Sequence, residues 1–178
     1  NSFQYLYKKL EESGEYDLKC SYVQFNFIRG REFTKRVDDM LQELATAKYV
    51  FIDDASLILS SIPLRKETVA INLWHACGAF KKFGQRGTNI PVPTDIATHA
   101  QYNLVSVSGE NVRSIYADAF DVNYQKVQAL GTPRTDDYFN KKLISKKKRQ
   151  IYLKHPKLLF KSVLVYAPTF RDTDGKRN

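Results

Sequence analysis

Apolar residues recur along much of the chain at the spacing of amphipathic α-helices. This spacing predicts one helix over 3–10, which ends before Gly14, and a second helix over 31–47. The expected buried face of the second helix comprises Phe33, Val37, Met40, Leu41 and Leu44. Ser108 is the expected N-cap of a third helix. The expected buried face of that helix comprises Val112, Ile115, Tyr116, Ala119 and Phe120.

Between these helices lie short runs that are rich in β-branched and aromatic residues, as is typical of strands. The predicted strands are 18–27, 49–52, 67–73, 102–107, 126–130 and 162–167. Strands that alternate with helices favour an α/β fold with a Rossmann-like parallel sheet. Ligands of such sheets bind beyond the carboxyl ends of the strands, and three polar clusters follow predicted strands here: 74–84, 131–136 and 168–172.

Basic residues are concentrated in one part of this chain of 178 residues and net charge +9. From Tyr138 to Arg171 there are ten Lys or Arg residues and no Asp or Glu. Such a stretch predicts an anionic partner, either phospholipid headgroups, a phosphate polymer or nucleic acid, unless it is a solvated linker. No apolar run is long enough to span a bilayer. The chain opens at Asn1 without a signal peptide, so we expect a piece of a longer protein. The two cysteines, Cys20 and Cys77, form no CxxC pair, which favours a reducing cytoplasm.

His75 is the main candidate for catalysis. It follows a predicted strand, where an imidazole can act as a general base, and it precedes a candidate helix whose first amides, at 76–79, could bind a phosphate oxygen. The alternative is a histidine that packs under Trp74 and bonds to the backbone. Cys77 is a weaker candidate for a nucleophile, since no orienting Asn or Asp is evident. His99 and His155 are expected at the surface or in a linker, and neither has a partner at the spacing of metal ligands.

A second candidate site follows the strand at 126–130. The chain lacks both the GxGxxG dinucleotide fingerprint and the P-loop signature. In the sequence Gly131-Thr132-Pro133-Arg134-Thr135-Asp136, glycine permits a tight turn and Arg134 offers a planar donor pair to phosphate or carboxylate. The alternative is a structural loop in which an Arg and an Asp form a surface pair.

Three motifs occur in order: Trp74–Gly84 (WHACGAFKKFG), Gly131–Asp136 (GTPRTD) and Tyr166–Asp172 (YAPTFRD). Together they resemble the CDP-glycerol glycerophosphotransferase family, the polymerases and primases of teichoic acid synthesis. The resemblance extends from Ala47 through Asp172. Many members have Gly directly after the histidine, whereas this chain has Ala76-Cys77 before Gly78. The identity of the polyol is therefore left open.

The resemblance implies a B-type glycosyltransferase (GT-B) fold with two Rossmann-like halves. Residues 1–143 would form the acceptor-side half, 144–160 a basic linker, and 161–178 the start of a truncated donor-side half, with a second essential histidine beyond residue 178. The implied reaction transfers glycerol phosphate or ribitol phosphate from CDP-glycerol or CDP-ribitol to the terminal hydroxyl of a membrane-linked acceptor, without a cofactor. This chain alone would be inactive.

Within that reaction, the resemblance implies that His75 is the catalytic base toward the acceptor hydroxyl. The implied substrate-binding residues are Trp74, Gly78, Lys81, Arg134, Asp136, Thr169, Arg171 and Asp172. An enzyme with a lipid-linked acceptor is expected to be peripheral on the inner face of the membrane. The expected membrane-binding residues are Lys141, Lys142, Lys146, Lys147, Lys148 and Arg149. The alternatives are a nucleotide-sugar glycosyltransferase of the same fold and a basic nucleic-acid-binding module.

Overall fold

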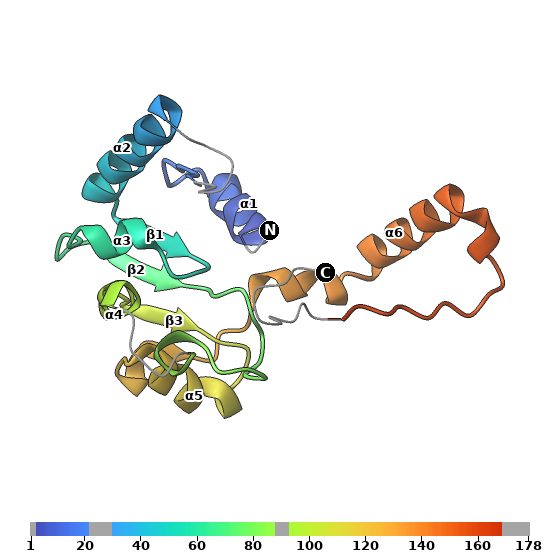
Figure 1. Ribbon diagram of the computed structural model, residues 1–178. Helices are drawn as coiled ribbons and strands as arrows, with labels where there is room; N and C mark the ends of the chain where they lie inside the picture. The colour runs from blue at the N-terminus through green and yellow to red at the C-terminus, as the bar shows by residue number, and fades with distance from the viewer. Residues whose placement is uncertain (1–2, 22–29, 88–92, 169–178) are drawn as a thin grey trace. The chain divides into compact units, whose positions relative to one another are not determined.

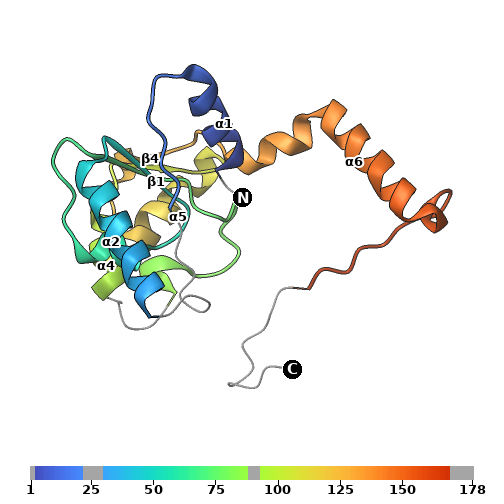
Figure 2. The same ribbon diagram turned by 90° about the horizontal axis from the view of Figure 1, so that it is seen from above.

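The computed structural model describes residues 3–21, 30–87 and 93–168 (Figures 1 and 2). The chain divides into two compact units, Asn1–Asp136 and Asp137–Asn178. The α-helices are α1 (Gln4–Ser13), α2 (Arg31–Thr46), α3 (Leu57–Ser61), α4 (Pro93–Ala100), α5 (Glu110–Phe120) and α6 (Lys141–Lys154). The strands are β1 (Tyr49–Ile52), β2 (Val69–Asn72), β3 (Leu104–Ser106) and β4 (Val127–Gln128). Short 3-10 helices are η1 (Gly84–Arg86), η2 (Tyr124–Lys126), η3 (Pro133–Phe139) and η4 (Pro156–Leu158).

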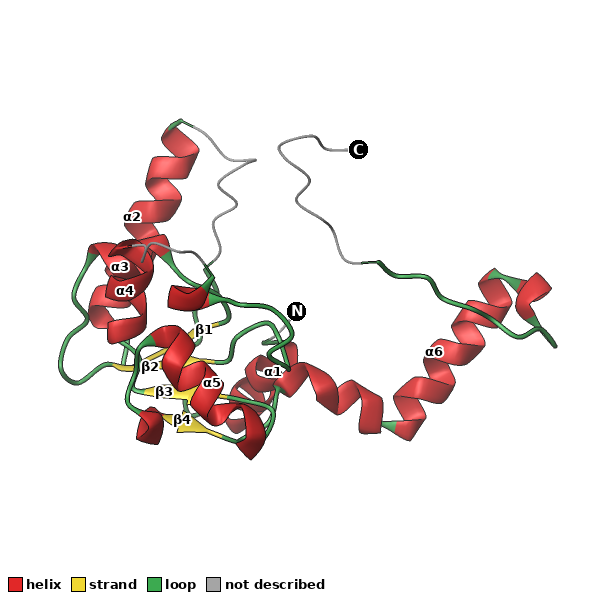
Figure 3. Ribbon diagram, turned by 60° about the horizontal axis from the view of Figure 1, so that its bottom comes forward, coloured by secondary structure: helices red, strands yellow, loops and turns green. Residues whose placement is uncertain are grey.

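The first unit is built on a four-stranded parallel sheet in the order β1-β2-β3-β4 (Figure 3). Because every strand runs in the same direction, the carboxyl ends of all four lie along one edge. The core combines Val105 and Val127 of the sheet with Tyr116 and Phe120 of α5, all of them at most 1% exposed. This architecture confirms the predicted α/β fold with a parallel sheet.

Hydrophobic periodicity located α2 and α5, but it did not predict α3 or α4. In α2 the five predicted apolar positions are all partly sheltered, whereas most of the remaining positions are exposed. In α5 four of the five predicted positions are buried, but Ile115 is 45% exposed. The predicted cap of α5 is also wrong, because Gly109 occupies the N-cap position and makes no side-chain bond. Ser108 instead donates its hydroxyl proton to the Cys77 carbonyl.

Two predicted strands and one predicted helix differ from the structure. Residues 18–21 form no strand, and most of the remainder of 18–27 lies outside the described residues. Residues 162–167 are described but pair with no described segment, and Leu164 and Tyr166 are 95% and 85% exposed. β-branched composition alone cannot make a strand when no neighbour supplies the hydrogen bonds.

None of the helices among the described residues is long and apolar enough to cross a membrane.

The candidate helix after His75 is also absent. Residues 75–83 form an irregular loop, which the short 3-10 helix η1 follows. The carbonyl groups of Ala76, Cys77 and Gly78 accept hydrogen bonds from side chains of other segments, not from amides of a following helical turn. There is consequently no helix N-terminus at 76–79, and the predicted phosphate site of helical amides is wrong.

Candidate active site

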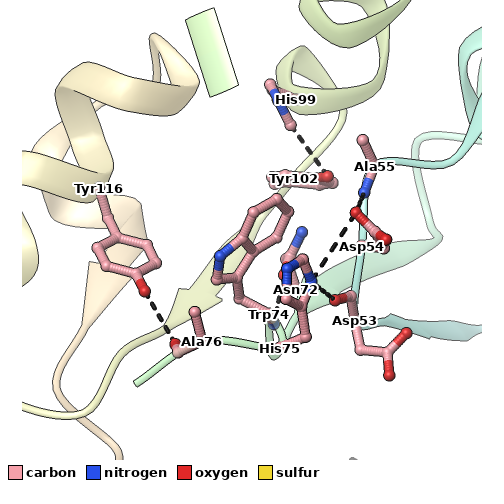
Figure 4. Close-up of polar contacts among 10 residues, drawn as sticks. All are labelled: Asp53, Asp54, Ala55, Asn72, Trp74, His75, Ala76, His99, Tyr102 and Tyr116. Carbon is pink, nitrogen blue, oxygen red and sulfur yellow. Dashed lines mark hydrogen bonds and ion pairs between the residues drawn. The ribbon is translucent and has the colours of Figure 1, made fainter. Parts of the chain in front are cut away.

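The carboxyl edge of the sheet collects the loops that follow its strands. Asp53 and Asp54 follow β1, His75 follows β2, Ser108 follows β3 and Gly131 follows β4. Figure 4 shows the first two of these loops side by side, with Asp53 and Asp54 beside the imidazole. Two of the three predicted polar clusters, 74–84 and 131–136, do follow strands of this sheet, namely β2 and β4. The third, 168–172, follows no strand among the described residues, and the pair Asp53 and Asp54 after β1 was not predicted.

Trp74 turns the chain sharply after β2. Its φ of +45° lies in the left-handed region, which costs a non-glycine residue about 1–3 kcal/mol. The backbone N–H of Trp74 donates to the Asn72 side-chain oxygen at 2.6 Å. The indole is 7% exposed and packs edge-on against Phe120, with ring centroids 4.9 Å apart. Trp74 is thus a buried support for the residue that follows it, and any role in contacting substrate stays a prediction.

His75 projects from this turn with one nitrogen bonded and its side chain 48% exposed. Its imidazole stacks on the Trp74 indole at 4.4 Å between centroids, and Nδ1 lies 3.0 Å from the Asp53 carbonyl oxygen (Figure 4). A carbonyl oxygen can only accept, so Nδ1 carries the proton and the neutral ring has its lone pair on Nε2. The ring therefore makes the contacts with Trp74 and the backbone that the structural alternative predicted. It also has the tautomer that a general base requires.

A carboxylate stands beside the same imidazole nitrogen. Asp54 Oδ1 lies 3.9 Å from His75 Nδ1 and accepts a hydrogen bond from the Ala55 amide at 2.8 Å, which orients the carboxylate. When His75 takes up a proton, the nearby negative charge stabilises the resulting imidazolium. The Asp54 side chain is 70% exposed, so solvent screens this attraction and its contribution is modest.

The loop after His75 is held by α5. The Tyr116 hydroxyl lies 2.9 Å from the Ala76 carbonyl oxygen and 3.2 Å from that of Gly78, and donates its proton between them. Burial, and to a smaller extent the Cys77 thiol, raises the pKa of Tyr116 to about 12, so the phenol stays a donor at physiological pH. Sequence reasoning assigned Tyr116 to the core, and nothing in the helical spacing indicated its hydroxyl contacts.

The end of this loop is fixed by close packing. Gly84 has a φ of +56°, and a Cβ atom there would lie 2.3 Å from the Ala119 carbonyl oxygen. Two residues later, Arg86 forms a two-point ion pair with Asp118 of α5. This contact holds the pKa of Asp118 below its usual range and raises that of Arg86. The loop that begins at His75 is therefore anchored to α5 at both ends.

The second candidate cluster begins after β4. The Gly131 amide donates to the Val107 carbonyl at 2.9 Å, and the Ser106 hydroxyl donates to the Gly131 carbonyl at 2.8 Å. These bonds hold the segment to the end of β3. Arg134 is partly buried and Asp136 exposed, both on η3. Their contact with substrate stays a prediction.

The remaining candidates are distributed as follows. Gly78 is partly buried and Lys81 is exposed, both in the loop after His75. The six predicted membrane-binding residues all lie on α6, in the second unit, and all are exposed. Thr169, Arg171 and Asp172 lie outside the described residues. Among the described residues, no group of three His, Cys, Asp or Glu side chains could hold a metal ion.

Two side chains are placed differently from expectation. His99 was expected at the surface, but it is fully buried on α4, with Nδ1 3.0 Å from the Tyr102 hydroxyl and its ring 4.4 Å from that of Phe120. The helix that buries it was not predicted. Cys77 is a free and exposed cysteine. Its described polar contact is made by the backbone carbonyl, and no described hydrogen bond links its thiol to an activating base.

Comparison with known proteins adds a family. The model of the CDP-Glycerol:Poly(glycerophosphate) glycerophosphotransferase family matches residues 1–177. A teichoic acid poly(ribitol-phosphate) polymerase of Bacillus spizizenii is 36% identical over 96% of this chain and 28% of its own length. A teichoic acid ribitol-phosphate primase of the same organism is 40% identical over 74% of this chain and 35% of its own length. The chain thus spans about a third of the length of these curated relatives.

A solved structure supports the fold independently. A structure of the wall teichoic acid polymerase TagF superposes with a TM-score of 0.67, covering 96% of this chain and 44% of that chain. Sequence identity in this superposition is 16%, so the likeness concerns the fold. It supports the predicted GT-B-type architecture, of which the present chain matches somewhat less than half.

Proposed function

Because the chain belongs to the CDP-glycerol:poly(glycerophosphate) glycerophosphotransferase family, we propose that the protein transfers glycerol phosphate or ribitol phosphate from a CDP-polyol to the terminal hydroxyl of a lipid-linked acceptor in teichoic acid synthesis. The family description names a glycerophosphate, whereas the two curated relatives are named for ribitol phosphate. A donor screen decides between the two polyols.

His75 is the general base of the proposed reaction. The acceptor hydroxyl gives its proton to Nε2 as its oxygen attacks the β-phosphorus of the donor. A new P–O bond forms to the acceptor, and the bond from the β-phosphorus to the bridging oxygen breaks, so that CMP leaves. Proton transfer to a positioned histidine contributes about 10²–10⁴-fold to the rate of such reactions.

The observation that carries this assignment is the contact between His75 Nδ1 and the Asp53 carbonyl. It fixes the neutral tautomer with its basic nitrogen on Nε2, on a side chain that is half exposed at the carboxyl edge of a parallel sheet. Asp54 stabilises the imidazolium after proton transfer. A histidine kept only for packing would need neither an exposed ring nor a neighbouring carboxylate.

The other parts of the chain complete the proposal. Residues 1–143 form the acceptor-side half, 144–160 a basic and largely helical linker, and 161–178 the start of the donor-side half, in which Thr169, Arg171 and Asp172 meet the donor. The basic side chains of α6 attract the anionic inner leaflet, each by about 1 kcal/mol near its surface. The protein is accordingly peripheral on the cytoplasmic face of the membrane, and it does not act on nucleic acid.

A donor screen tests the proposed reaction. The full-length gene product is incubated with a lipid-linked acceptor and with CDP-glycerol, CDP-ribitol or a nucleotide-sugar, and nucleotide release is measured. We expect CMP from one of the CDP-polyols and no nucleotide release from the sugar donors. Turnover of a nucleotide-sugar without CMP release from either CDP-polyol would replace the proposal with the glycosyltransferase alternative.

A further inference from the structure

A buried amide stands at the end of the strand that leads into His75. Asn72 is the last residue of β2 and is fully buried. It is paired in the sheet with Ile52 of β1 and Val105 of β3, so neighbouring strands fix its backbone on both sides. The adjoining core is apolar and includes Val105 and Trp74. A polar side chain in such a place requires an explanation.

Stability does not provide that explanation. Asn72 Oδ1 accepts a hydrogen bond from the Trp74 backbone N–H at 2.6 Å, whereas Nδ2 is buried without a partner among the described residues. The orientation of the amide follows from chemistry, because only its oxygen can face an N–H donor. A buried donor without an acceptor destabilises a fold, so an apolar residue of similar shape would serve packing better.

The one bond that Asn72 makes falls on a strained residue. Trp74 has a φ of +45°, a conformation that bulky residues rarely adopt. The bond to Asn72 ties the amide of this residue to the rigid centre of the sheet. Trp74 in turn carries the imidazole of His75, which stacks on its indole at 4.4 Å between centroids (Figure 4). The orientation of His75 therefore depends on the conformation that Asn72 holds.

We propose that Asn72 is a positioning residue, which holds Trp74 in its left-handed conformation and so aims His75 Nε2 at the acceptor hydroxyl. The statement about the acceptor hydroxyl rests on the proposed function. The statement that Asn72 sets the geometry of His75 is independent of that function. A functional site that tolerates an unpaired buried donor to keep one orienting bond is a common form of the compromise between stability and activity.

The test compares two substitutions in the full-length gene product. Asn72→Leu keeps the approximate shape of the side chain but removes the acceptor, whereas Asn72→Asp keeps an oxygen that faces the Trp74 N–H. Thr68→Val is the matched control. Thr68 is a buried polar residue directly before the first residue of the same strand, and its hydroxyl donates to the Ala47 carbonyl at 2.7 Å.

Two readouts are required: kcat and KM with the donor that the screen identifies, and the ¹⁵N chemical shifts of the His75 imidazole, assigned with His75→Gln. For Asn72→Leu we expect kcat to fall about 10- to 100-fold, as a misplaced catalytic group implies, with little change in KM. The His75 signals should move away from the form protonated at Nδ1. Asn72→Asp should retain more activity than Asn72→Leu, and Thr68→Val should leave both readouts unchanged.

The outcomes separate the two claims. Wild-type His75 signals in folded Asn72→Leu would overturn the positioning role, whatever the activity. Altered His75 signals with an unchanged kcat would confirm the positioning role and contradict the assignment of His75 as the base. If Asn72→Leu does not fold, the signals and kcat of Asn72→Asp decide, since wild-type-like values are expected there and a displaced His75 would overturn the inference.

Discussion

Removing one hydroxyl from α5 should loosen the loop that follows His75. Tyr116 is 1% exposed, and its ring packs against Phe83 and Phe120. Tyr116→Phe keeps this packing and removes only the hydrogen bond that the carbonyls of Ala76 and Gly78 share. One such bond contributes about 1 kcal/mol, and we expect the free energy of unfolding at pH 8 to fall by that amount.

The pH dependence of this difference gives a sharper test. The pKa of Tyr116 is about 12 in the folded protein because of burial, above its ordinary value of 10.0. Above pH 10 the phenol ionises in the unfolded chain but not yet in the folded one, which favours unfolding. The contribution of Tyr116 is therefore fully present below pH 10 and is lost as the pH rises through 12. This pKa difference corresponds to about 2–3 kcal/mol.

Because phenylalanine does not ionise, the stability advantage of the wild type over Tyr116→Phe should shrink as the pH rises. Equilibrium urea unfolding of the full-length gene product, measured from pH 8 to pH 11.5, should show the wild type as the more stable protein at pH 8. Its advantage should disappear or reverse toward pH 11.5. Tyr138→Phe, at a position that is 77% exposed, is the control and should show no such crossing. A difference between wild type and Tyr116→Phe that stays constant over this range would refute the reasoning.

Three further substitutions test other contacts of the site and of α6. Gly84→Ala should lower the free energy of unfolding by about 1–3 kcal/mol, because Gly84 has a positive φ and lies close to Ala119. Gly87→Ala is the control and should cost less, because Gly87 has a φ of −73°. Thermal unfolding compares the two variants, and equal losses of stability would contradict the packing argument. Asp54→Asn should lower kcat by a few-fold, about what an exposed pair contributes, while Asp53→Asn should not, because only the backbone carbonyl of Asp53 contacts His75. Replacing Lys147 and Lys148 with alanine should weaken co-sedimentation with anionic vesicles at low salt, compared with the same change at Lys8 and Lys9 of α1. Salt-dependent binding of the wild type to duplex DNA but not to vesicles would favour the nucleic-acid alternative.

The parts of the fold that could be predicted are those in which a local pattern coincides with burial. In α2 the apolar positions recur every three to four residues and all of them are sheltered, so the spacing alone located the helix. β1 is a short apolar run between the polar residues Lys48 and Asp53. The expectation that polar clusters gather at strand ends required only that the strands be parallel.

The parts that could not be predicted depend on contacts between distant segments. The carbonyls after His75 bond to Tyr116 and Ser108, and a local pattern cannot anticipate donors that lie more than 30 residues away. The tautomer of His75 follows from a contact with Asp53, 22 residues earlier. The pair Asp53-Asp54, directly after a predicted strand, was the signal that could have identified these neighbours in advance.

The central claim is that His75 is the base that accepts the proton of the acceptor hydroxyl, and the turnover of two variants of the same loop tests it most directly. In the full-length gene product, His75→Ala should lower kcat for CMP release by about 10²–10⁴-fold and remain folded, because the imidazole is half exposed. Cys77→Ser, two residues away, should retain most of the activity, since the proposed reaction has no covalent intermediate. A folded His75→Ala protein with a kcat near that of the wild type would contradict the account.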